Sequence, residues 1–334
     1  MLIKNYQLVF LRFLIIGTVI SISSNSWFLA WIGLEINLIS IIPLFVYKID
    51  NNSTESSIKY FLPQAIASVA IILCASIDIA VASYRMFSFT HLILTSALMI
   101  KLGLPPFHFW FPQIINKMSW SLCIVIISWQ KLAPFMLIST ILINPIISPI
   151  IIITALIGAM GGFNQNLTKL IITYSSISHG AWILPLIIFS TQNWIFYFLI
   201  YCLISFSLIY MLKIYNILKT SNLSNLHLPN NSKITIILIL ISLGGLPPLL
   251  GFIAKLNAII TILNFSGTPI LLVLISSSLV SLFYYIKLTY SITTIFPFKP
   301  LKYLKTLSNP IILSAIIYIS ILGNTITPLI ISLI

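Results

Sequence analysis

The sequence predicts an all-α protein that crosses a membrane many times. Three observations lead to this prediction: the composition, the lengths of the apolar stretches, and the positions of the basic residues between them. Of the 334 residues, 59% are hydrophobic and 6% are charged, and the mean hydropathy is +1.12. Soluble proteins carry about a quarter charged residues. With four acidic residues in the whole chain, a water-soluble surface is excluded.

The apolar stretches are long enough to cross a bilayer as helices, each of which needs about 20 residues. The two longest contain the motifs LGLPPF and GGLPPL, in which proline removes a backbone donor and glycine frees the chain. We expect each of these two to form two half-helices around a break. The break residues are Gly103, Pro105, Pro106, Gly245, Pro247 and Pro248. We expect eleven spans: residues 5–22, 25–47, 58–83, 88–115, 120–142, 148–163, 169–188, 193–219, 232–263, 268–295 and 308–331.

Basic residues between these spans alternate in number, as the positive-inside rule requires of a correct count. The opposite connections contain only Arg85. The alternation places the N-terminus in the positive-inside compartment. The basic residues of the N-terminus and of every second connection are Lys4, Lys48, Lys59, Lys117, Lys169, Lys219, Lys233, Lys299, Lys302 and Lys305.

Several classes of function are excluded by this layout. The formal net charge of +13 is spread singly along the chain, which does not indicate nucleic-acid binding. The connections are too short for a nucleotide-binding fold, and no phosphate-binding glycine motif occurs in a strand–helix context. The three cysteines lie in separate apolar segments, so neither a disulfide framework nor a metal site is expected. Any activity therefore lies within the bilayer.

Charged residues near the middle of predicted spans are the candidate functional residues. Glu35, Lys101 and Lys131 lie within one residue of the centres of the spans 25–47, 88–115 and 120–142. A charge at mid-membrane costs about 2.5–3.5 kcal/mol, so it is retained for a reason. A buried lysine can lose its proton and a nearby carboxylate can restore it, whereas arginine stays charged. We therefore expect a switchable proton relay.

Lys255 and His179 extend this candidate relay into the second half of the chain. Lys255 follows the second break, in a half-helix whose N-terminal dipole disfavours a positive charge. Lys101 precedes the first break, where the dipole favours one. His179 could pass protons between lysines or serve as a hydrogen-bonding core residue, and His108 has the same two interpretations.

Other observations keep less specific explanations open. Arg12, Lys213, Lys287 and Asp78 lie near span ends, from which long side chains reach the interface. Whether His108 and Lys287 join the relay is left open. A Glu35–Lys101 pair could also act only to lock helices together.

The two proline motifs indicate an internal repeat. Gly103 and Gly245 are 142 residues apart, and five predicted spans separate the motifs. Because five is odd, the second unit enters the membrane in the opposite sense, as in ion-coupled transporters. We expect a first unit at residues 1–144, an inverted second unit at 145–298, and an appended helix at 299–334.

The motifs together resemble a known family. They are GLEINLISIIPL around Glu35, MIKLGLPPFHFWFPQI around Lys101, SWQKLAPF around Lys131, SSISHGAW around His179 and GGLPPLLGFIAKL around Lys255. They are similar to the chain 2 family of mitochondrial NADH:ubiquinone oxidoreductase, respiratory complex I, in its animal and particularly insect form. The resemblance covers essentially the whole chain. Bacterial members have three further N-terminal helices, which this sequence lacks.

This resemblance implies an antiporter-like fold and a role in proton pumping across the mitochondrial inner membrane. It implies a Glu35–Lys101 pair, a central Lys131 and a terminal Lys255 on a hydrated axis, with the N-terminus in the matrix. No cofactor is expected in this chain; NADH, FMN, iron–sulfur clusters and ubiquinone would be used by other subunits. Expected partners are other membrane-arm subunits, including neighbouring antiporter-like subunits, and phospholipid. Two alternatives remain: an Mrp-type cation/proton antiporter subunit, and a scaffold whose buried charges only fix packing.

Overall fold

The computed structural model describes residues 5–46, 50–80, 84–141, 147–225, 230–247, 249–265 and 267–293. These ranges are helical almost throughout. Their one extended feature is an isolated antiparallel bridge between Leu167 and Lys219. Several predictions lie outside the described residues: the helix at 308–331, the break residue Pro248, and the basic residues Lys4, Lys48, Lys299, Lys302 and Lys305.

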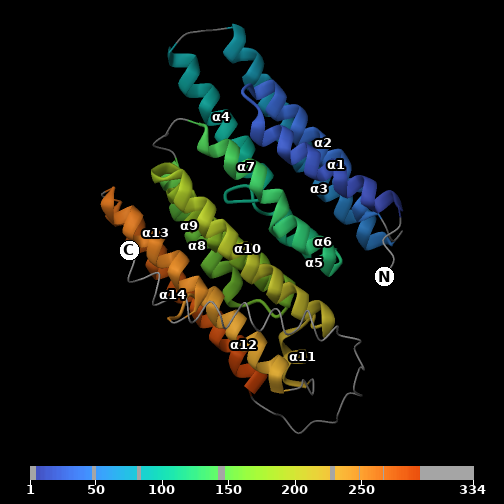
Figure 1. Cartoon of the computed structure of the whole chain (residues 1–334), viewed down its shortest axis with the longest axis vertical. Coiled ribbons are helices and arrows are strands. Elements are labelled where there is room, and N and C mark those ends of the chain that lie inside the picture. Colours follow the sequence, from blue (N-terminus) through green and yellow to red (C-terminus); the bar gives the residue numbers. More distant parts are fainter. Residues whose placement is uncertain are drawn as a thin grey trace. The chain divides into compact units, whose positions relative to one another are not determined.

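The chain divides into two compact units, Met1–Ile150 and Ile151–Ile334. Figure 1 shows the helices of each unit in the colours of the sequence. The helices of the first unit are α1 (Asn5–Ser23), α2 (Trp27–Phe45), α3 (Asn51–Ala80), α4 (Tyr84–Leu102), α5 (Trp110–Lys117), α6 (Trp120–Ile127) and α7 (Trp129–Ser139). After α8 (Ile147–Phe163), which spans the division, the second unit has α9 (Thr168–Phe189), α10 (Thr191–Ile214), α11 (Thr220–Asn225), α12 (Asn230–Gly244), α13 (Leu250–Asn264) and α14 (Thr268–Thr293).

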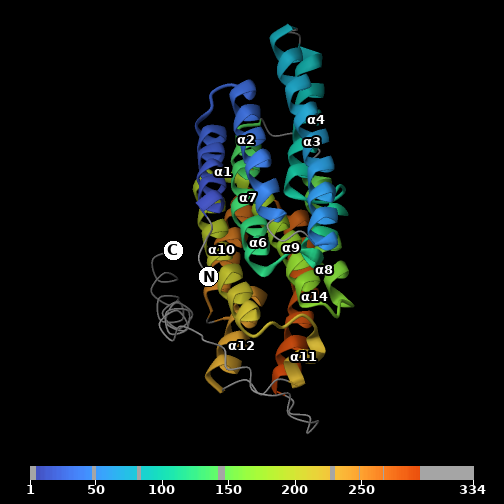
Figure 2. The ribbon, with the colours of Figure 1, turned by 90° about the vertical axis from the view of Figure 1, so that its right-hand side faces the viewer.

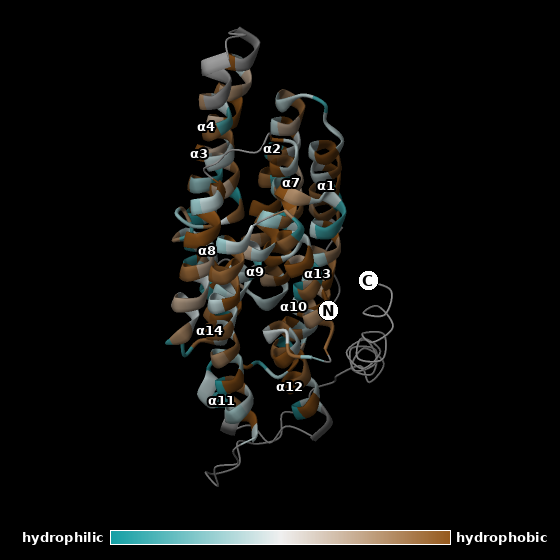
Figure 3. Ribbon diagram, turned by 90° about the vertical axis from the view of Figure 1, so that its left-hand side faces the viewer, coloured by the Kyte–Doolittle hydropathy of each residue, from teal (hydrophilic) through white to brown (hydrophobic). Residues whose placement is uncertain are grey.

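The predicted membrane architecture is confirmed within the described residues. Every predicted span that falls there coincides with one helix or with two consecutive helices. Seven helical stretches are long and apolar enough to cross a membrane, and four shorter apolar helices accompany them. Hydrophobic residues dominate the helices, as the brown ribbon of Figure 3 shows. Large side chains such as Ile66 on α3 and Leu272 on α14 are 64% and 69% exposed, as expected of helix faces that meet lipid.

Helices α1 and α2 pack closely because glycines face each other between them. The two helices run side by side in Figures 1 and 2. A Cβ atom added to Gly33 would lie 2.6 Å from the backbone nitrogen of Ser21 and 2.7 Å from the carbonyl oxygen of Gly17. Small residues allow backbones to approach in this way in membrane proteins, where dispersion rather than the hydrophobic effect holds helices together.

Both predicted helix breaks are present, and both begin with the same hydrogen-bond pattern. Helix α4 ends at Leu102 and α5 begins at Trp110, while α12 ends at Gly244 and α13 begins at Leu250. Gly103 and Gly245 have φ angles of 65° and 77°, the left-handed region that glycine adopts without steric cost.

A Schellman motif closes the first half-helix at each break. Gly103 donates to the carbonyl of Ile100 and Leu104 to that of Met99. In the second unit Gly245 donates to Ser242 and Leu246 to Ile241. The chain then continues through proline, which has no N–H to donate and so does not resume the helix at once. The two motifs are therefore equivalent in backbone structure as well as in sequence.

Two features differ from the expectation. The predicted span 120–142 is not one continuous helix, because Ser128 separates α6 from α7. The Ser128 hydroxyl donates to the carbonyl of Ile124 at 2.6 Å, a back-bond that competes with regular helix geometry. The connection after α10 also contains the short helix α11, where no element was expected.

Candidate functional site

Three of the predicted charged residues, Glu35, Lys101 and Lys131, lie in the first unit, and the two lysines lie at helix ends. Lys101 occupies the last turn of α4 and is 6% exposed, and Lys131 occupies the first turn of α7 and is 2% exposed. Glu35, in α2, is half-buried. The unpredicted interruption at Ser128 therefore places Lys131 beside a helix end, as the Gly103 break does for Lys101.

Glu35 and Lys101 interact through space and not by contact. The carboxylate of Glu35 exerts an attraction on the Lys101 ammonium. In the part of the chain that the structure describes, salt bridges join Glu55 to Lys59 and Lys117, and none joins Glu35 to Lys101. The expected pair is therefore electrostatic only. A charge held without a locked partner is free to respond to changes in its surroundings.

Lys131 has an aromatic neighbour. Its Nζ lies 5.1 Å from the centre of the Phe111 ring, close enough for a cation–π interaction. Phe111 is in α5, directly after the first break, and is itself 1% exposed. The break thus contributes to the surroundings of both lysines of the first unit.

The sequence analysis missed a cluster of amides around Lys101. Gln130 Nε2 donates to Asn37 Oδ1 at 2.7 Å, and the Tyr60 hydroxyl donates to Gln130 Oε1 at 3.4 Å. Gln64 Nε2 donates to the carbonyl oxygen of Lys101 at 3.2 Å. These four side chains, together with Lys101, line a small cavity. Its other lining residues are Leu34, Leu38 and Pro134.

Two sequence signals could have identified part of this cluster. Asn37 lies two residues after Glu35, and Gln130 directly precedes Lys131. Uncharged polar residues inside a span usually face other helices, where they find hydrogen-bond partners. Which partners they find depends on tertiary packing, because Asn37 and Gln130 are 93 residues apart.

In the second unit, Lys255 reaches back across the break. It lies in α13, is 8% exposed, and donates from Nζ to the carbonyl oxygen of Gly244 at 2.8 Å. Gly244 is the last residue of α12, where unpaired carbonyls carry partial negative charge. The sequence analysis considered only the dipole of α13 and did not include this carbonyl, which the long side chain reaches in the opposite half-helix.

Gly245 is required at this break for two reasons. Its φ angle of 77° favours glycine, and a Cβ added there would lie 2.7 Å from Cδ and 3.1 Å from Nζ of Lys255. Pro247 follows in the connection to α13. Glycine at position 245 is therefore favoured both by the backbone turn and by the space that the Lys255 side chain occupies.

His179 is a hydrogen-bonded core residue of α9. It is 7% exposed, and its Nδ1 lies 2.9 Å from the Tyr197 hydroxyl. Its ring centre is 4.9 Å from that of Tyr201. This contact fits both interpretations of the residue, because an imidazole that is hydrogen-bonded to a phenol can be a core residue and can also exchange protons.

The remaining charged or titratable candidates differ in exposure. Arg12, Lys213 and Lys287 are exposed on their helices, which favours the interfacial explanation for these three. His108 lies in the first break and is 6% exposed. The side chain of Asp78 is outside the described part.

The chain is similar to known membrane proteins in sequence and in fold. The sequence profile of the family described as NADH:quinone oxidoreductase/Mrp antiporter, transmembrane, matches residues 24–283. NADH-ubiquinone oxidoreductase chain 2 of Anopheles gambiae is 41% identical over 292 residues, which cover 85% of each chain.

Two solved structures share the fold. A chain of respiratory complex I from Thermus thermophilus has a TM-score of 0.87 at 20% identity, covering 97% of this chain and 78% of that one. A chain of the Mrp complex from a Dietzia species has a TM-score of 0.76 at 18% identity, covering 88% of this chain and 62% of that one. At these identities the likeness shows a common antiporter-like membrane fold.

Proposed function

This chain belongs to the family of NADH-ubiquinone oxidoreductase chain 2 proteins, and from this premise we propose that it translocates protons through its buried lysines. The observation that carries the proposal is the burial of three ammonium groups beside helix interruptions, at Lys101, Lys131 and Lys255. Charged side chains buried within a membrane protein are energetically costly, and those that are present mark ion or proton pathways. Interrupted helices expose carbonyls that bind water, which a proton path needs.

Within the first unit, Lys101 and Lys131 act as proton-holding sites in different surroundings. Lys101 lies against the polar cavity and feels the charge of Glu35, whereas Lys131 lies over the Phe111 ring. A proton arriving at one ammonium repels a proton on the other, so their occupancies are coupled. Movement of Glu35 toward or away from Lys101 would change this electrostatic coupling.

In the second unit, Lys255 holds its proton against the carbonyl of Gly244, and His179 is a second exchangeable group. Helices α9 and α13, which bear these two residues, are in contact. Protonation of Lys255 strengthens its bond to the carbonyl because charge-assisted hydrogen bonds are about twice as strong as neutral ones. We assign Glu35, Lys101, Lys131, His179 and Lys255 to the relay.

The proposal places this chain in the mitochondrial inner membrane with its N-terminus in the matrix, in line with the alternation of basic connections. It assembles with the other membrane subunits of respiratory complex I, including neighbouring antiporter-like subunits, and with phospholipid. Electron transfer from NADH to ubiquinone, with FMN and iron–sulfur clusters, occurs in other subunits and drives the relay. We also propose that residues 1–144 and 145–298 form inverted repeats, followed by an appended helix at 299–334, which the equivalent breaks at Gly103 and Gly245 support.

The alternative function is that of an Mrp-type cation/proton antiporter subunit, which the fold shared with the Dietzia chain supports. Purification distinguishes the two. A subunit of the respiratory complex copurifies with NADH:ubiquinone oxidoreductase activity, and an antiporter subunit does not.

Lys131→Met tests the proposal directly, because methionine keeps the length and apolar stem of lysine while removing its charge. Lys213→Met is the matched control, since this lysine is exposed at the end of α10. We expect both variants to assemble on native gels, and only Lys131→Met to lose coupled proton translocation per NADH oxidised. Normal pumping by an assembled Lys131→Met complex would leave the lysines with an architectural role and refute the proposal.

A further inference from the structure

The carbonyl oxygen of Lys101 loses its helical donor at the first break. In a continuous helix this oxygen would accept from the N–H group four residues later in the chain. That residue is Pro105, which has no N–H. Gln64 of α3 supplies a donor instead, because its Nε2 donates to the Lys101 carbonyl at 3.2 Å. A side chain from a neighbouring helix therefore caps the end of α4.

This bond determines how the buried amide of Gln64 is turned. A carbonyl oxygen only accepts, so the amide nitrogen faces the backbone of Lys101 and the amide oxygen points away from it. In the part of the chain that the structure describes, Gln64 Oε1 accepts no hydrogen bond. Buried acceptors in native proteins are nearly always paired with protein or with ordered water. The oxygen of this amide therefore indicates a site for a donor.

The ammonium group of Lys101 lines the same cavity as Gln64. Among the described residues its Nζ has no hydrogen-bond or ion-pair partner, and Glu35 attracts it only through space. Lys255 of the second unit differs, because its Nζ donates to the Gly244 carbonyl at the corresponding break. In the first unit an amide caps the break, and the donors of the lysine remain available to another ligand.

The cavity at these two groups suits one water molecule. Its volume is about 10 Å³, which is close to the smallest volume that holds one water. It presents a donor at Lys101 and an acceptor at Gln64, and water satisfies both by accepting from the first and donating to the second. A metal cation would be repelled by the ammonium, and an anion by the amide oxygen. Neutral water is therefore the ligand that these groups select.

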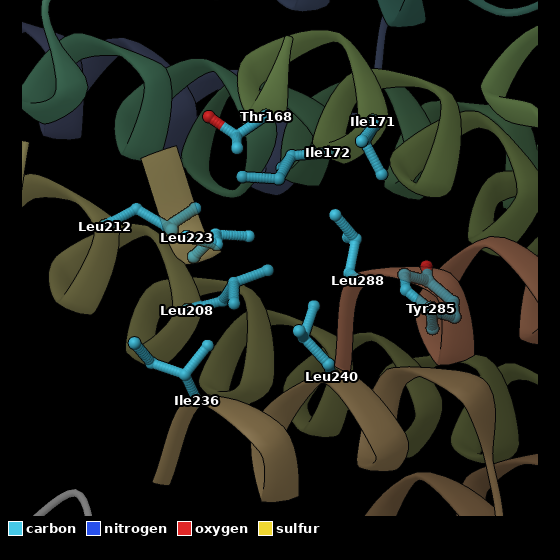
Figure 4. A pocket seen from close by; sticks show the side chains of 10 residues that line it. All are labelled: Thr168, Ile171, Ile172, Leu208, Leu212, Leu223, Ile236, Leu240, Tyr285 and Leu288. Carbon is cyan, nitrogen blue, oxygen red and sulfur yellow. The ribbon is translucent and has the colours of Figure 1, made fainter. Parts of the chain in front are cut away.

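The second unit contains a larger cavity with the opposite lining, which we call the apolar cavity. Its volume is about 20 Å³, and side chains from α9, α10, α11, α12 and α14 converge on it (Figure 4). Eight of its ten lining residues are leucine or isoleucine, and the hydroxyl of Thr168 donates to the carbonyl of Ile217. Apolar cavities stay dry even when water would fit. Chemistry rather than volume thus distinguishes the two cavities.

We propose that Gln64 is a positioning residue of the relay, which caps α4 with its amide nitrogen and holds one water molecule against the Lys101 ammonium with its amide oxygen. The inference rests on the proposed function, since it gives one site of that relay a further residue and a ligand. A bound water is nearly as good a partner as a protein group. Water accepts from an ammonium and donates to a neutral amine, whereas a carboxylate partner favours the ammonium alone.

A cryo-EM map of the intact respiratory complex, at a resolution that shows ordered water, tests the ligand. We expect one water peak within about 2.7–3.2 Å of both Lys101 Nζ and Gln64 Oε1. The apolar cavity should contain no peak in the same map. A map that shows water elsewhere in the membrane subunits but none at Lys101 overturns the inference, whatever the variants do.

The variant Gln64→Met tests the positioning role, because methionine keeps the length of glutamine and removes both polar atoms. Ser68→Ala is the matched control, since it removes a buried hydroxyl one turn further along α3 and outside the cavity. We expect both variants to assemble on native gels. The water peak should be missing from the Gln64→Met complex, and its proton-to-NADH ratio should fall by about half or more at alkaline pH. Ser68→Ala should keep the normal ratio.

The pH dependence separates positioning from a purely structural role. A charged lysine without a hydrogen-bond partner is harder to form, so a pH lower by about one unit should restore the ratio of the Gln64→Met complex. The titratable groups on the other helices around the cavity are unchanged in this variant: Glu35 on α2, Tyr60 on α3 and Lys131 on α7. A normal ratio, or one reduced equally at every pH, overturns the positioning role. If Gln64→Met does not assemble, the map of the unmodified complex decides alone.

Lys131→Met is measured in parallel, so that the two proposals fail separately. If it loses pumping while the map shows no water at Lys101, the inference is refuted and the lysine relay stands. If Lys131→Met pumps normally, the proposed function fails, and Gln64 then has no relay to serve even where the water is present.

Discussion

Gly245→Ala isolates the contribution of the second break, because the structure predicts two separate costs for a single added methyl group. The backbone there has a φ angle of 77°, and holding alanine in the left-handed region costs about 1–2 kcal/mol. The new Cβ would also lie 2.7 Å from Cδ and 3.1 Å from Nζ of Lys255, closer than side-chain atoms pack.

The side chain of Lys255 must therefore move, and its ammonium loses the 2.8 Å bond to the Gly244 carbonyl. A hydrogen bond to a charged group contributes about 1.5–3 kcal/mol. We expect Gly245→Ala to destabilise the protein by about 2.5–5 kcal/mol in all. We also expect it to impair pumping more than assembly, because the displaced group belongs to the proposed relay.

The assay measures native-gel assembly and coupled proton translocation in the same membranes. Gly244→Ala is the matched control, since its added Cβ would meet no side-chain atom nearer than 3.6 Å and its carbonyl remains available. Gly103→Ala carries the same backbone cost at a φ angle of 65°, but its Cβ would also lie 2.9 Å from Cβ of Phe111, whose ring faces Lys131, so it disturbs the first unit rather than serving as a neutral control. Unimpaired coupling in an assembled Gly245→Ala complex would contradict the role given to the Lys255 contact.

Two further changes test the first unit. Gln130→Leu leaves Asn37 Oδ1 buried without its donor and should lower the stability of the protein by about 1–3 kcal/mol. Adding Asn37→Leu should lower the stability little further, because both partners of the bond are then gone, so additive losses of stability in thermal assembly assays would refute the contact. Gly33→Ala forces α1 and α2 apart, because its Cβ would lie 2.6 Å from the Ser21 nitrogen, and should lower the stability by about 1–3 kcal/mol. An unchanged thermal stability of the assembled complex would show that the two helices do not pack this closely.

Much of the fold could be predicted because each membrane helix is specified by its own residues. Hydropathy located the spans, and the LGLPPF and GGLPPL motifs located both breaks, since glycine and proline act on the local backbone. The burial of Lys101 and Lys131 could be expected for the same reason, because each lies near the centre of an apolar stretch. The exposure of Arg12, Lys213 and Lys287 agrees with the interfacial interpretation of charges near span ends.

The contacts of these residues could not be predicted in the same way. The bond between Gln130 and Asn37 joins residues 93 positions apart and exists only once α2 and α7 have packed. The reach of Lys255 to Gly244 depends on a side-chain direction that counting does not give. The interruption at Ser128 has no glycine or proline to mark it, and serine back-bonding is a weak local signal.

The bond between Lys255 and the Gly244 carbonyl also makes the rigidity of the second break depend on the protonation of Lys255. The lysine belongs to α13 and the carbonyl to α12, so the bond fastens two half-helices that the chain otherwise connects only through the Gly–Leu–Pro turn. Its strength falls by about half when the amine is neutral. The rigidity of the connection between α12 and α13 therefore depends on whether Lys255 is protonated. Conversely, a movement that opens the angle between these half-helices weakens the bond and makes it easier for Lys255 to lose its proton.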